Sequence, residues 1–427
     1  MAAIDTGDTA WMMVSAALVL LMIPGLSLFY GGMVRSKSVL NMIMMSFSAL
    51  GLVAVLWILY GFSITFGNSI GDAGFVGDVT QFLGLSSLMN TEAVIGTIPA
   101  PVFIAFQGMF AAITVALISG SIADRAKFGS WLVFAGIWAT VVYFPVAHWV
   151  FAFDEFVATT GGWIANDLGA IDFAGGTAVH INAGAAGLAL AIVLGKRIGF
   201  GKTPMRPHNL PLVMLGAALL WFGWFGFNAG SAVGSNGLAG VAFINTIGAT
   251  AAAMLSWLLV EKIRDGHATS LGAASGVVAG LVAITPACAS VDAIGALIIG
   301  AISGILCALS VGLKFKFGYD DSLDVGAVHL VGGLVGTILI GVVGLEVGLL
   351  NGGGSEQLVK QLIGAGAVLA YSFVATLIIG KLIDLIIGFR LTADEEQAGI
   401  DVSSHAERGY ELSDSSQGGL SGASKGA

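Results

Sequence analysis

Two histidines lie deep inside glycine-rich apolar segments, and their surroundings repeat. His180 and His329 each end an Ala-Val-His triplet, and each is followed by glycine four and seven positions later. Residues at these spacings share one face of a helix. Small residues on a membrane helix mark the face where neighbouring backbones approach closely. Both imidazoles are therefore predicted to point into the protein interior, where an ionisable ring indicates a functional site.

A neutral imidazole offers one hydrogen-bond donor and one acceptor, so a facing pair could relay a proton or orient a small polar molecule in an apolar passage. Two other interpretations remain open. Each histidine could simply form an interhelical hydrogen bond, or the two rings could ligate a haem iron as in membrane b-type cytochromes. These segments offer few of the further ligands or polar groups that redox cytochromes need. We therefore expect no cofactor and no metal.

The elements that would position these rings are membrane helices. Hydrophobic residues make up 56% of the 427 residues and charged residues only 10%, which excludes an ordinary soluble domain. Stretches of roughly 20 apolar residues can cross a bilayer. Eleven stretches reach that length, at residues 9–32, 39–67, 98–123, 128–151, 174–195, 210–233, 239–262, 268–288, 291–313, 325–350 and 358–389. The predicted fold class is an all-α integral membrane protein with eleven transmembrane helices.

The positions of the basic residues predict the orientation of the chain. Lysine and arginine follow the odd-numbered stretches, as Arg125 and Lys127 follow the third, whereas the other connections carry mostly acidic residues. Of the 17 lysines and arginines, only Lys360 falls on the acidic side. Because cytoplasmic loops carry the excess of basic residues, we expect the N-terminus outside and the C-terminus inside the cell.

The positions of the two histidines indicate an internal repeat. His180 lies on the fifth stretch and His329 on the tenth, so each closes a group of five. Because five is odd, the second group must be inserted upside down relative to the first. This pattern is typical of an inverted-topology repeat, in which the substrate path lies near the midplane of the membrane. The two repeats are predicted to cover about 9–195 and 210–350.

The eleventh stretch and the C-terminal tail lie outside this repeat. Residues 358–389 are predicted to brace the two repeats within one transmembrane domain of residues 1–389. The remaining residues, 390–427, form a cytoplasmic tail. Its end, after about residue 413, is rich in serine and glycine and is therefore predicted to be disordered.

Five motifs, in this order along the chain, resemble those of a known family. They are Phe29 to Arg35, Ala105 to Gly108, Asp172 to His180, Trp224 to Ser231, and Asp324 to Gly336. Across roughly residues 9–410 the chain is similar to the ammonium transporter (Amt/Mep/Rh) family, most of all to its bacterial Amt branch. The resemblance implies a homotrimer in the cell membrane with one narrow pore per subunit and ammonium as substrate. It implies a transporter rather than an enzyme, with no nucleic-acid partner.

The resemblance also implies roles for individual residues. His180 and His329 match the paired histidines that line the family's hydrophobic pore. Phe110 and Ser231 match two members of the outer ammonium site, where the third member is a tryptophan. Phe151 stands at the tryptophan position here, and phenylalanine binds cations more weakly than tryptophan does. This departure from the family pattern leaves the ammonium affinity of the outer site open.

Four further aromatic residues surround this predicted site in the sequence. Trp149 and Trp163 are close to Phe151 along the chain, and either could take its place. Phe106 and Phe227 match the pair of stacked rings that closes the pore beneath the outer site in the family. From the residues alone, ordinary interhelical packing is the favoured explanation of Phe106 and Phe110, which are one turn apart on one face, and only the resemblance favours a role in transport.

Two aspartates precede the histidine segments. Asp172 matches the family's essential acidic residue, which there supports the architecture of the site. It lies eight residues before His180, or about 12 Å along a helix. Its position beside two glycines predicts that it caps the start of a helix. Asp324, just before the tenth stretch, is predicted to be its counterpart in the second repeat.

A hydrophobic pore suits the separation of ammonium from potassium, a cation of similar size. Stripping water from an ion in the bilayer is costly, so an apolar pore rejects potassium. Ammonium can instead lose its proton, which desolvation favours, and cross as neutral ammonia. The histidines could relay that proton, which makes transport electrogenic, or only orient ammonia. The sequence leaves these two mechanisms open.

The cytoplasmic tail also carries part of the resemblance. Residues 391–410 resemble the family's cytoplasmic segment that contacts neighbouring subunits and receives PII-type signalling proteins. An ammonium sensor that uses the same pocket is the alternative to a transporter, and a haem-binding redox protein is a more distant one. In each case the lipid bilayer surrounds the protein.

Overall fold

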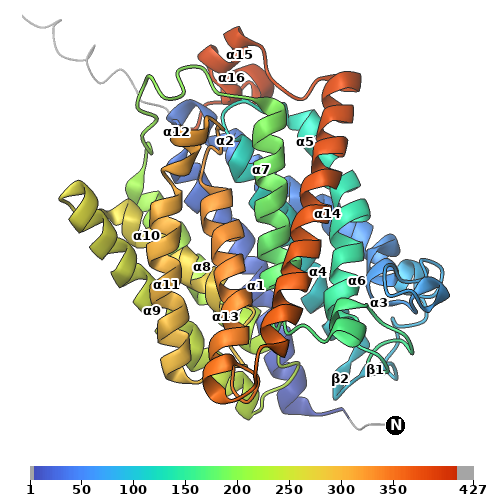
Figure 1. Cartoon of the computed structure of the whole chain (residues 1–427). Coiled ribbons are helices and arrows are strands. Elements are labelled where there is room, and N and C mark those ends of the chain that lie inside the picture. Colours follow the sequence, from blue (N-terminus) through green and yellow to red (C-terminus); the bar gives the residue numbers. More distant parts are fainter. Residues whose placement is uncertain (1–3, 411–427) are drawn as a thin grey trace, which may run out of the picture.

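The computed structural model describes residues 4–410, which form a bundle of long helices (Figure 1). Within these residues, ten helical segments are long and apolar enough to cross a membrane, and an eleventh apolar helix, Ser270–Ile284, is shorter. The chain is therefore an all-α, multi-pass membrane protein. All eleven segments coincide with the predicted stretches.

Several of these segments consist of an α-helix joined end to end with a short turn of a different helix type. The helices at the predicted stretches are α1 (Thr6–Met33), α2 (Val39–Leu56) with α3 (Phe62–Phe66), α4 (Ala100–Ile118), α5 (Phe128–Trp138) with α6 (Phe144–Phe151), α7 (Asn182–Leu194), α8 (Leu210–Gly230), α9 (Gly237–Asp265), α10 (Ser270–Ile284), α11 (Ala293–Ser310), α13 (Val331–Val343) and α14 (Glu356–Ile387). Three short helices, α12 (Leu313–Phe317), α15 (Ala393–Ala398) and α16 (Ile400–His405), lie outside them.

Two predicted stretches are longer than the helices that form there. The stretch 268–288 ends as a helix at Ile284, because the chain then makes consecutive turns in which Ala287 N donates to Ile284 O and Ser290 N to Ala287 O. The stretch 325–350 ends as a helix at Val343, where Gly344 adopts an extended backbone. The apolar sequence continues beyond both helix ends, but the helical conformation of the backbone stops there.

The two ends of the bundle differ in structure (Figure 1). One end, here called the N-terminal end, carries the start of α1 and a small hairpin of β1 (Val94–Ile95) and β2 (Ile98–Pro99). The opposite end, here called the tail end, carries α12, α15 and α16. The tail therefore folds back against the bundle where it leaves α14.

The tail residues make specific contacts with the helix connections at the tail end. Leu391 N donates to Arg125 O, and the Asp401 carboxylate accepts from Leu40 N and Asn41 N at the start of α2. Residues 391–410 thus pack on their own subunit. The predicted disordered segment after residue 413 lies outside the described residues.

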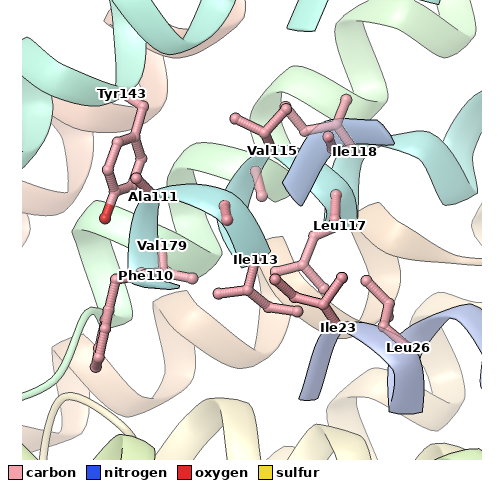
Figure 2. Close-up of a cluster of buried hydrophobic side chains, with 14 of the residues drawn as sticks. Ile23, Leu26, Phe110, Ala111, Ile113, Val115, Leu117, Ile118, Tyr143 and Val179 are labelled. Carbon is pink, nitrogen blue, oxygen red and sulfur yellow. The ribbon is translucent and has the colours of Figure 1, made fainter. Parts of the chain in front are cut away.

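The core of the bundle is built around α1, α4 and α8. α1 packs along α8, and α4 packs against α1, α2 and α7. Phe110, Ile113 and Leu117 follow one another at helical spacing on α4, with Val179 near Phe110 and Ile113 and with Leu26 of α1 on the side of Leu117 (Figure 2). These residues lie beside the histidine segments.

The histidine segments approach each other as the glycine spacing predicts. α7 contacts the turn before α13, and α13 contacts the turn before α7. A Cβ added to Gly184, four residues after His180, would collide with the backbone of Leu330. A Cβ added to Gly333, four residues after His329, would lie 3.1 Å from the nitrogen of Ile181. The predicted close backbone contact is confirmed on both helices, and it is reciprocal.

Candidate functional site

The two histidine side chains face each other inside the bundle. Their Nδ1 atoms lie 3.2 Å apart, which is a hydrogen-bond distance, and their ring centroids lie 5.3 Å apart with an angle of 23° between the planes. His180 is 1% exposed and His329 is 3% exposed, so both rings are removed from bulk solvent. One ring donates through Nδ1 and the other accepts, which leaves Nε2 of each ring free for other roles.

Each histidine lies in a π-helical turn rather than in a regular α-helix. His180 lies in η8 (Gly176–Ile181), which leads into α7, and His329 lies in η9 (Gly326–Leu330), which leads into α13. A π-turn adds one residue to a helical turn and rotates the following side chains, and such turns are frequent at functional sites. The sequence predicted regular helices here, and the π-turns were not expected.

A narrow apolar chamber adjoins the histidine pair on the N-terminal side. It is lined by Met22, Leu26, Phe29, Ile113, Leu117, Val179, His180, Leu220, Trp224, Phe227, Val278 and His329. The Trp224 ring stacks on His180 with a centroid distance of 5.4 Å and an angle of 20°. Trp224 thereby fixes the plane of the His180 ring, a role that the sequence analysis did not assign.

A second chamber continues from His329 towards the tail end. It is lined by Phe29, Tyr30, Met33, Trp257, Ser275, Val278, Val311, Leu323, Asp324, Val328 and His329. The two chambers share Phe29, Val278 and His329 in their walls, and their volumes are about 10 and 20 Å³, roughly enough for a single water molecule each. The histidine pair lies where the two chambers adjoin, and the row that the chambers form along the bundle is called the path below.

The stacked phenylalanine pair above this path differs from the prediction. Phe227 stacks on Phe110, with ring centroids 4.1 Å apart and 25° between the planes. Phe106 instead packs edge-on against Phe110, at 4.8 Å and 62°. Phe106 and Phe110 are one turn apart on α4, and α8 places Phe227 level with Phe110. The expected stacking of Phe106 on Phe227 is therefore wrong.

Phe151 is the third aromatic ring at this end of the path. Its centroid lies 6.4 Å from that of Phe110, edge to face. Trp149 packs against Trp163 and Tyr371 instead, and its Nε1 donates to Phe75 O. Among the three aromatic residues that the sequence left open, Phe151 is thus the one that contacts Phe110.

Ser231 ends α8 one turn after Phe227. Its hydroxyl donates to the main-chain oxygen of Phe227 at 2.8 Å, so the hydroxyl oxygen keeps its lone pairs for a further donor. Ser231 is partly exposed, whereas Phe110 and Phe227 are buried. An N–H group that arrives from the N-terminal end would therefore meet this acceptor before the stacked rings.

Asp172 caps the π-turn of His180, as predicted. Its Oδ1 accepts from Gly175 N and Gly176 N at 2.8 and 2.6 Å, and its Oδ2 accepts from the backbone and hydroxyl of Thr177. The side chain is directed at the free N–H groups of a helix start, which a carboxylate stabilises. Asp172 therefore fixes the backbone that carries His180.

The counterpart of Asp172 in the second histidine segment is Asp321, not Asp324. Asp321 Oδ1 accepts from Val325 N at 3.1 Å, and Oδ2 accepts from Gly326 N at 2.7 Å. Asp324 adopts a left-handed φ of 61° and pairs with Lys314, with 2.7 Å between Oδ1 and Nζ. The signal was present in the sequence, because Asp321 precedes His329 by the same eight residues that separate Asp172 from His180.

A buried ionic cluster closes the tail end around this segment. Arg197 forms a bidentate pair with Asp320 and a longer contact with Asp124, and Arg125 donates to the main-chain oxygen of Asp320. Burial lowers the pKa of the Arg125 guanidinium to about 10. Burial alone would raise the pKa of Asp320, but Arg197 holds it below its ordinary value. Burial raises the pKa of Asp324 to about 6.

The geometry of the histidine pair bears on the haem hypothesis. Two imidazoles on opposite sides of one metal ion place their nitrogens about 4 Å apart, because each metal–imidazole bond is about 2 Å long. The observed distance of 3.2 Å between the Nδ1 atoms is shorter. The pair therefore fits a direct hydrogen bond, and a metal ion between the two rings would require them to move apart.

The fold is that of a multi-pass membrane protein with two small, largely apolar chambers beside a buried histidine pair. Residues 10–410 match the model of the Ammonium Transporter Family. The chain is 63% identical to an ammonium transporter of Mycobacterium tuberculosis over 435 residues, which cover 96% of this chain and 91% of the relative. The chain belongs to the ammonium transporter family, whose members are transporters of the cell membrane rather than enzymes.

Solved structures agree with this assignment. The structure of Mep2 from Saccharomyces cerevisiae superimposes with a TM-score of 0.83 at 33% identity, and the match covers 91% of each chain. A structure described as a sensor Amt protein superimposes with a TM-score of 0.86 at 29% identity, covering 93% of this chain and 98% of that one. The likeness thus extends over almost the whole described fold.

Proposed function

We propose that this protein moves ammonium across the membrane by binding the cation at the N-terminal end, removing its proton and conducting ammonia past His180 and His329. The histidine pair is the observation that carries this proposal. Its two rings are buried, hydrogen-bonded to each other and placed between two chambers whose walls are otherwise mostly apolar. The family assignment supports ammonium as the substrate.

The physical basis is the difference between ammonium and potassium. Potassium keeps its charge, so the apolar chambers would leave it without its hydration shell. Ammonium can transfer its proton and pass as ammonia, which accepts and donates hydrogen bonds beside the imidazoles. The path therefore favours the species that can become neutral.

The test is a flux measurement on purified protein in proteoliposomes. Ammonium should evoke a current if the histidine pair relays the proton, and potassium at the same concentration should not. Ammonia flux without current would favour net gas conduction. An equal current with potassium, or neither flux nor current with ammonium, would refute the proposed function.

The outer site is proposed to consist of Phe110, Phe151 and Ser231. The edge-to-face contact of Phe151 with Phe110 and the free lone pairs of Ser231 support this assignment. The stacked rings of Phe227 and Phe110 would act as a gate between this site and the first chamber, which lies on the N-terminal side of the histidine pair. Cation–π and hydrogen-bond contacts together suit a small cation with N–H donors.

Changes at the outer site should weaken ammonium recruitment. Phe110→Ala and Ser231→Ala should each cost about 0.5–2 kcal/mol, which raises the half-saturating ammonium concentration by about 2- to 30-fold. Phe151→Trp should lower it, because tryptophan is the stronger cation-binding ring. Trp163→Phe, in the neighbouring aromatic cluster, is the matched control and should leave half-saturation unchanged. Unchanged values in both alanine variants would place the site elsewhere.

The topology is proposed to be eleven spans in two inverted repeats, about 9–195 and 210–350, with α14 as a brace. The reciprocal contacts of α7 and α13 and the equal spacing of their capping aspartates support a twofold relation. The tail end would face the cytoplasm, because the basic connections lie there.

Cysteine labelling on whole cells tests this orientation. Asp154 and Lys262 are both exposed: Asp154 lies in the connection after the fourth span, and Lys262 lies in the last turn of α9, the seventh span, at the tail end. A membrane-impermeant thiol reagent should label Asp154→Cys and spare Lys262→Cys, and both should react once the membrane is opened. The reverse pattern in intact cells would overturn the proposed topology.

The partners proposed for the tail end are two further copies of the chain and a PII-type signalling protein. Residues 391–410 support this docking role, because they form an ordered layer over the helix connections at the tail end. A chain truncated after Phe389 should therefore lose capture of a PII-type protein, whereas a chain truncated after Tyr410 should keep it. Equal capture by both chains would refute docking on residues 390–410.

An ammonium sensor remains the second candidate, because a sensor Amt protein is among the structural neighbours. A sensor would bind ammonium at the same outer site without conducting it. Binding by calorimetry together with a silent proteoliposome would favour the sensor, and ammonium flux favours the transporter.

A further inference from the structure

An ion pair lies between the second chamber and the surface of the tail end. Asp324 lines the second chamber, on the tail-end side of His329, whereas Lys314 of α12 lines a larger cavity of about 330 Å³ that opens at the tail end. Their side chains meet with 2.7 Å between Nζ and Oδ1 and are 9% and 19% exposed. Lys314 therefore lies across the junction of the path and the open cavity.

Unlike the carboxylates of Asp172 and Asp321, the Asp324 carboxylate does not cap a π-turn. Asp172 and Asp321 direct their oxygens at backbone N–H groups of the π-turns. Within residues 4–410, the polar group in contact with the Asp324 carboxylate is Lys314 Nζ. The carboxylate thus lies on the wall of the path and offers its oxygens to a cation.

The lysine group itself shows which cation fits. Lys314 Nζ also donates to the main-chain oxygen of Asp321 at 3.0 Å. A lysine head is a primary ammonium group with three N–H donors, and two of them are used here. Ammonium presents the same N–H donors, the same charge and no stem. It can replace the lysine head bond for bond, and the flexible lysine chain can then move into the open cavity.

We propose that the Asp324 carboxylate and the Asp321 main-chain oxygen form an ammonium-binding site at the tail-end exit, which Lys314 occupies as a tethered substitute for the substrate. The proposal rests on the transport function above and extends it to the exit. Ammonia that regains a proton on the tail-end side of His329, either from the histidine relay or from water that enters from the open cavity, would displace the Lys314 head from Asp324 before it leaves. The lysine returns afterwards and closes the path.

Chemical rescue of a lysine truncation tests the site. In Lys314→Ala the acceptors lose their cation, so added ammonium should fill the vacancy and stabilise the folded protein in detergent. The melting temperature of this variant should rise saturably with ammonium chloride, by about 2 °C or more beyond the wild-type response. Methylammonium should act similarly, and tetramethylammonium, which lacks N–H donors, should not.

Controls separate this site from general salt effects. Lys316→Ala removes an exposed lysine two residues away and should behave as wild type. Lys314→Ala combined with Asp324→Asn should lose the ammonium response. Sodium and potassium chloride at the same ionic strength should give no comparable shift, because two oxygens replace little of a metal ion's hydration. If Lys314→Ala does not fold in any salt, Lys314→Gln carries the same test.

The possible results decide between a binding site and a purely structural ion pair. An equal ammonium shift in wild type and Lys314→Ala, or an unchanged shift in the double variant, would overturn the proposal. A potassium shift as large as that of ammonium would make the site a general monovalent-cation site and overturn its assignment. The melting assay requires no conduction, so a silent wild-type proteoliposome refutes the transport function separately.

Discussion

Replacing either histidine of the pair with alanine should reduce ammonium flux in proteoliposomes by about 5- to 150-fold. Each substitution removes a donor–acceptor from the path and leaves the Nδ1 atom of the other ring without its partner at 3.2 Å. An unsatisfied buried polar group costs about 1–3 kcal/mol, which corresponds to this range of rates if it is felt at the barrier. The vacated volume would also admit water, so the remaining current should discriminate less against potassium.

A third buried histidine provides the control. His148 is fully buried in α6, where its Nδ1 lies 2.8 Å from Thr65 O, and it does not line either chamber. His148→Ala should destabilise the protein but keep the preference for ammonium over potassium in the folded fraction. Full, selective ammonium current in the double variant His180→Ala/His329→Ala would reduce the pair to a packing contact.

Removing the caps of the π-turns should lower both stability and flux. Asp172→Ala leaves several N–H groups at the start of η8 without the carboxylate, and hydrogen bonds to a charged group contribute about 1.5–3 kcal/mol each. Loss of two such bonds lowers the free energy of unfolding by at least about 3 kcal/mol. Asp321→Ala loses two such bonds, one of them longer at 3.1 Å, and should cost about 3 kcal/mol, less than Asp172→Ala, which loses more bonds. Chemical denaturation in detergent measures both.

The matched control is an aspartate cap away from the path. Asp292 accepts from Gly295 N at the start of α11, at 2.7 Å. Asp292→Ala should cost about 0.5–2 kcal/mol and leave ammonium flux per folded protein unchanged. Flux per folded protein should fall in Asp172→Ala and Asp321→Ala, because the histidine backbones are no longer fixed. If Asp172→Ala lost no more stability than Asp292→Ala, the cap would be an ordinary one.

The sequence predicts the helices and the histidine contact well, because both follow from local pattern. Apolar length locates the spans, and glycine four residues after each histidine predicts the close approach at Gly184 and Gly333. The helix ends at Ile284 and Val343 are harder to predict from the sequence, because the apolar composition continues beyond them. Only the backbone turns that follow decide where those helices stop.

Two of the errors at the site, the phenylalanine pair and the π-turns, have a common physical cause. Phe106 and Phe110 share one face of α4, and the depth of α8 along α4, a tertiary feature, decides which ring meets Phe227. The π-turns likewise depend on packing between the two histidine segments rather than on their composition. The misassigned Asp324 is different, because the eight-residue spacing from His329 already pointed to Asp321.

The ionic cluster at the tail end imposes an order on biosynthesis. Arg125 and Arg197 are made in the first half of the chain, but their shared partner Asp320 follows more than a hundred residues later. Arg390 and Glu396, which pair beside the cluster, come last. Until Asp320 emerges from the ribosome, Arg125 lacks this acceptor and Arg197 has only its longer contact with Asp124, so we expect the tail end not to reach its final packing. Final compaction of the tail end therefore waits for nearly the whole polypeptide, and a ribosome that stalls before residue 320 leaves an inserted but open bundle.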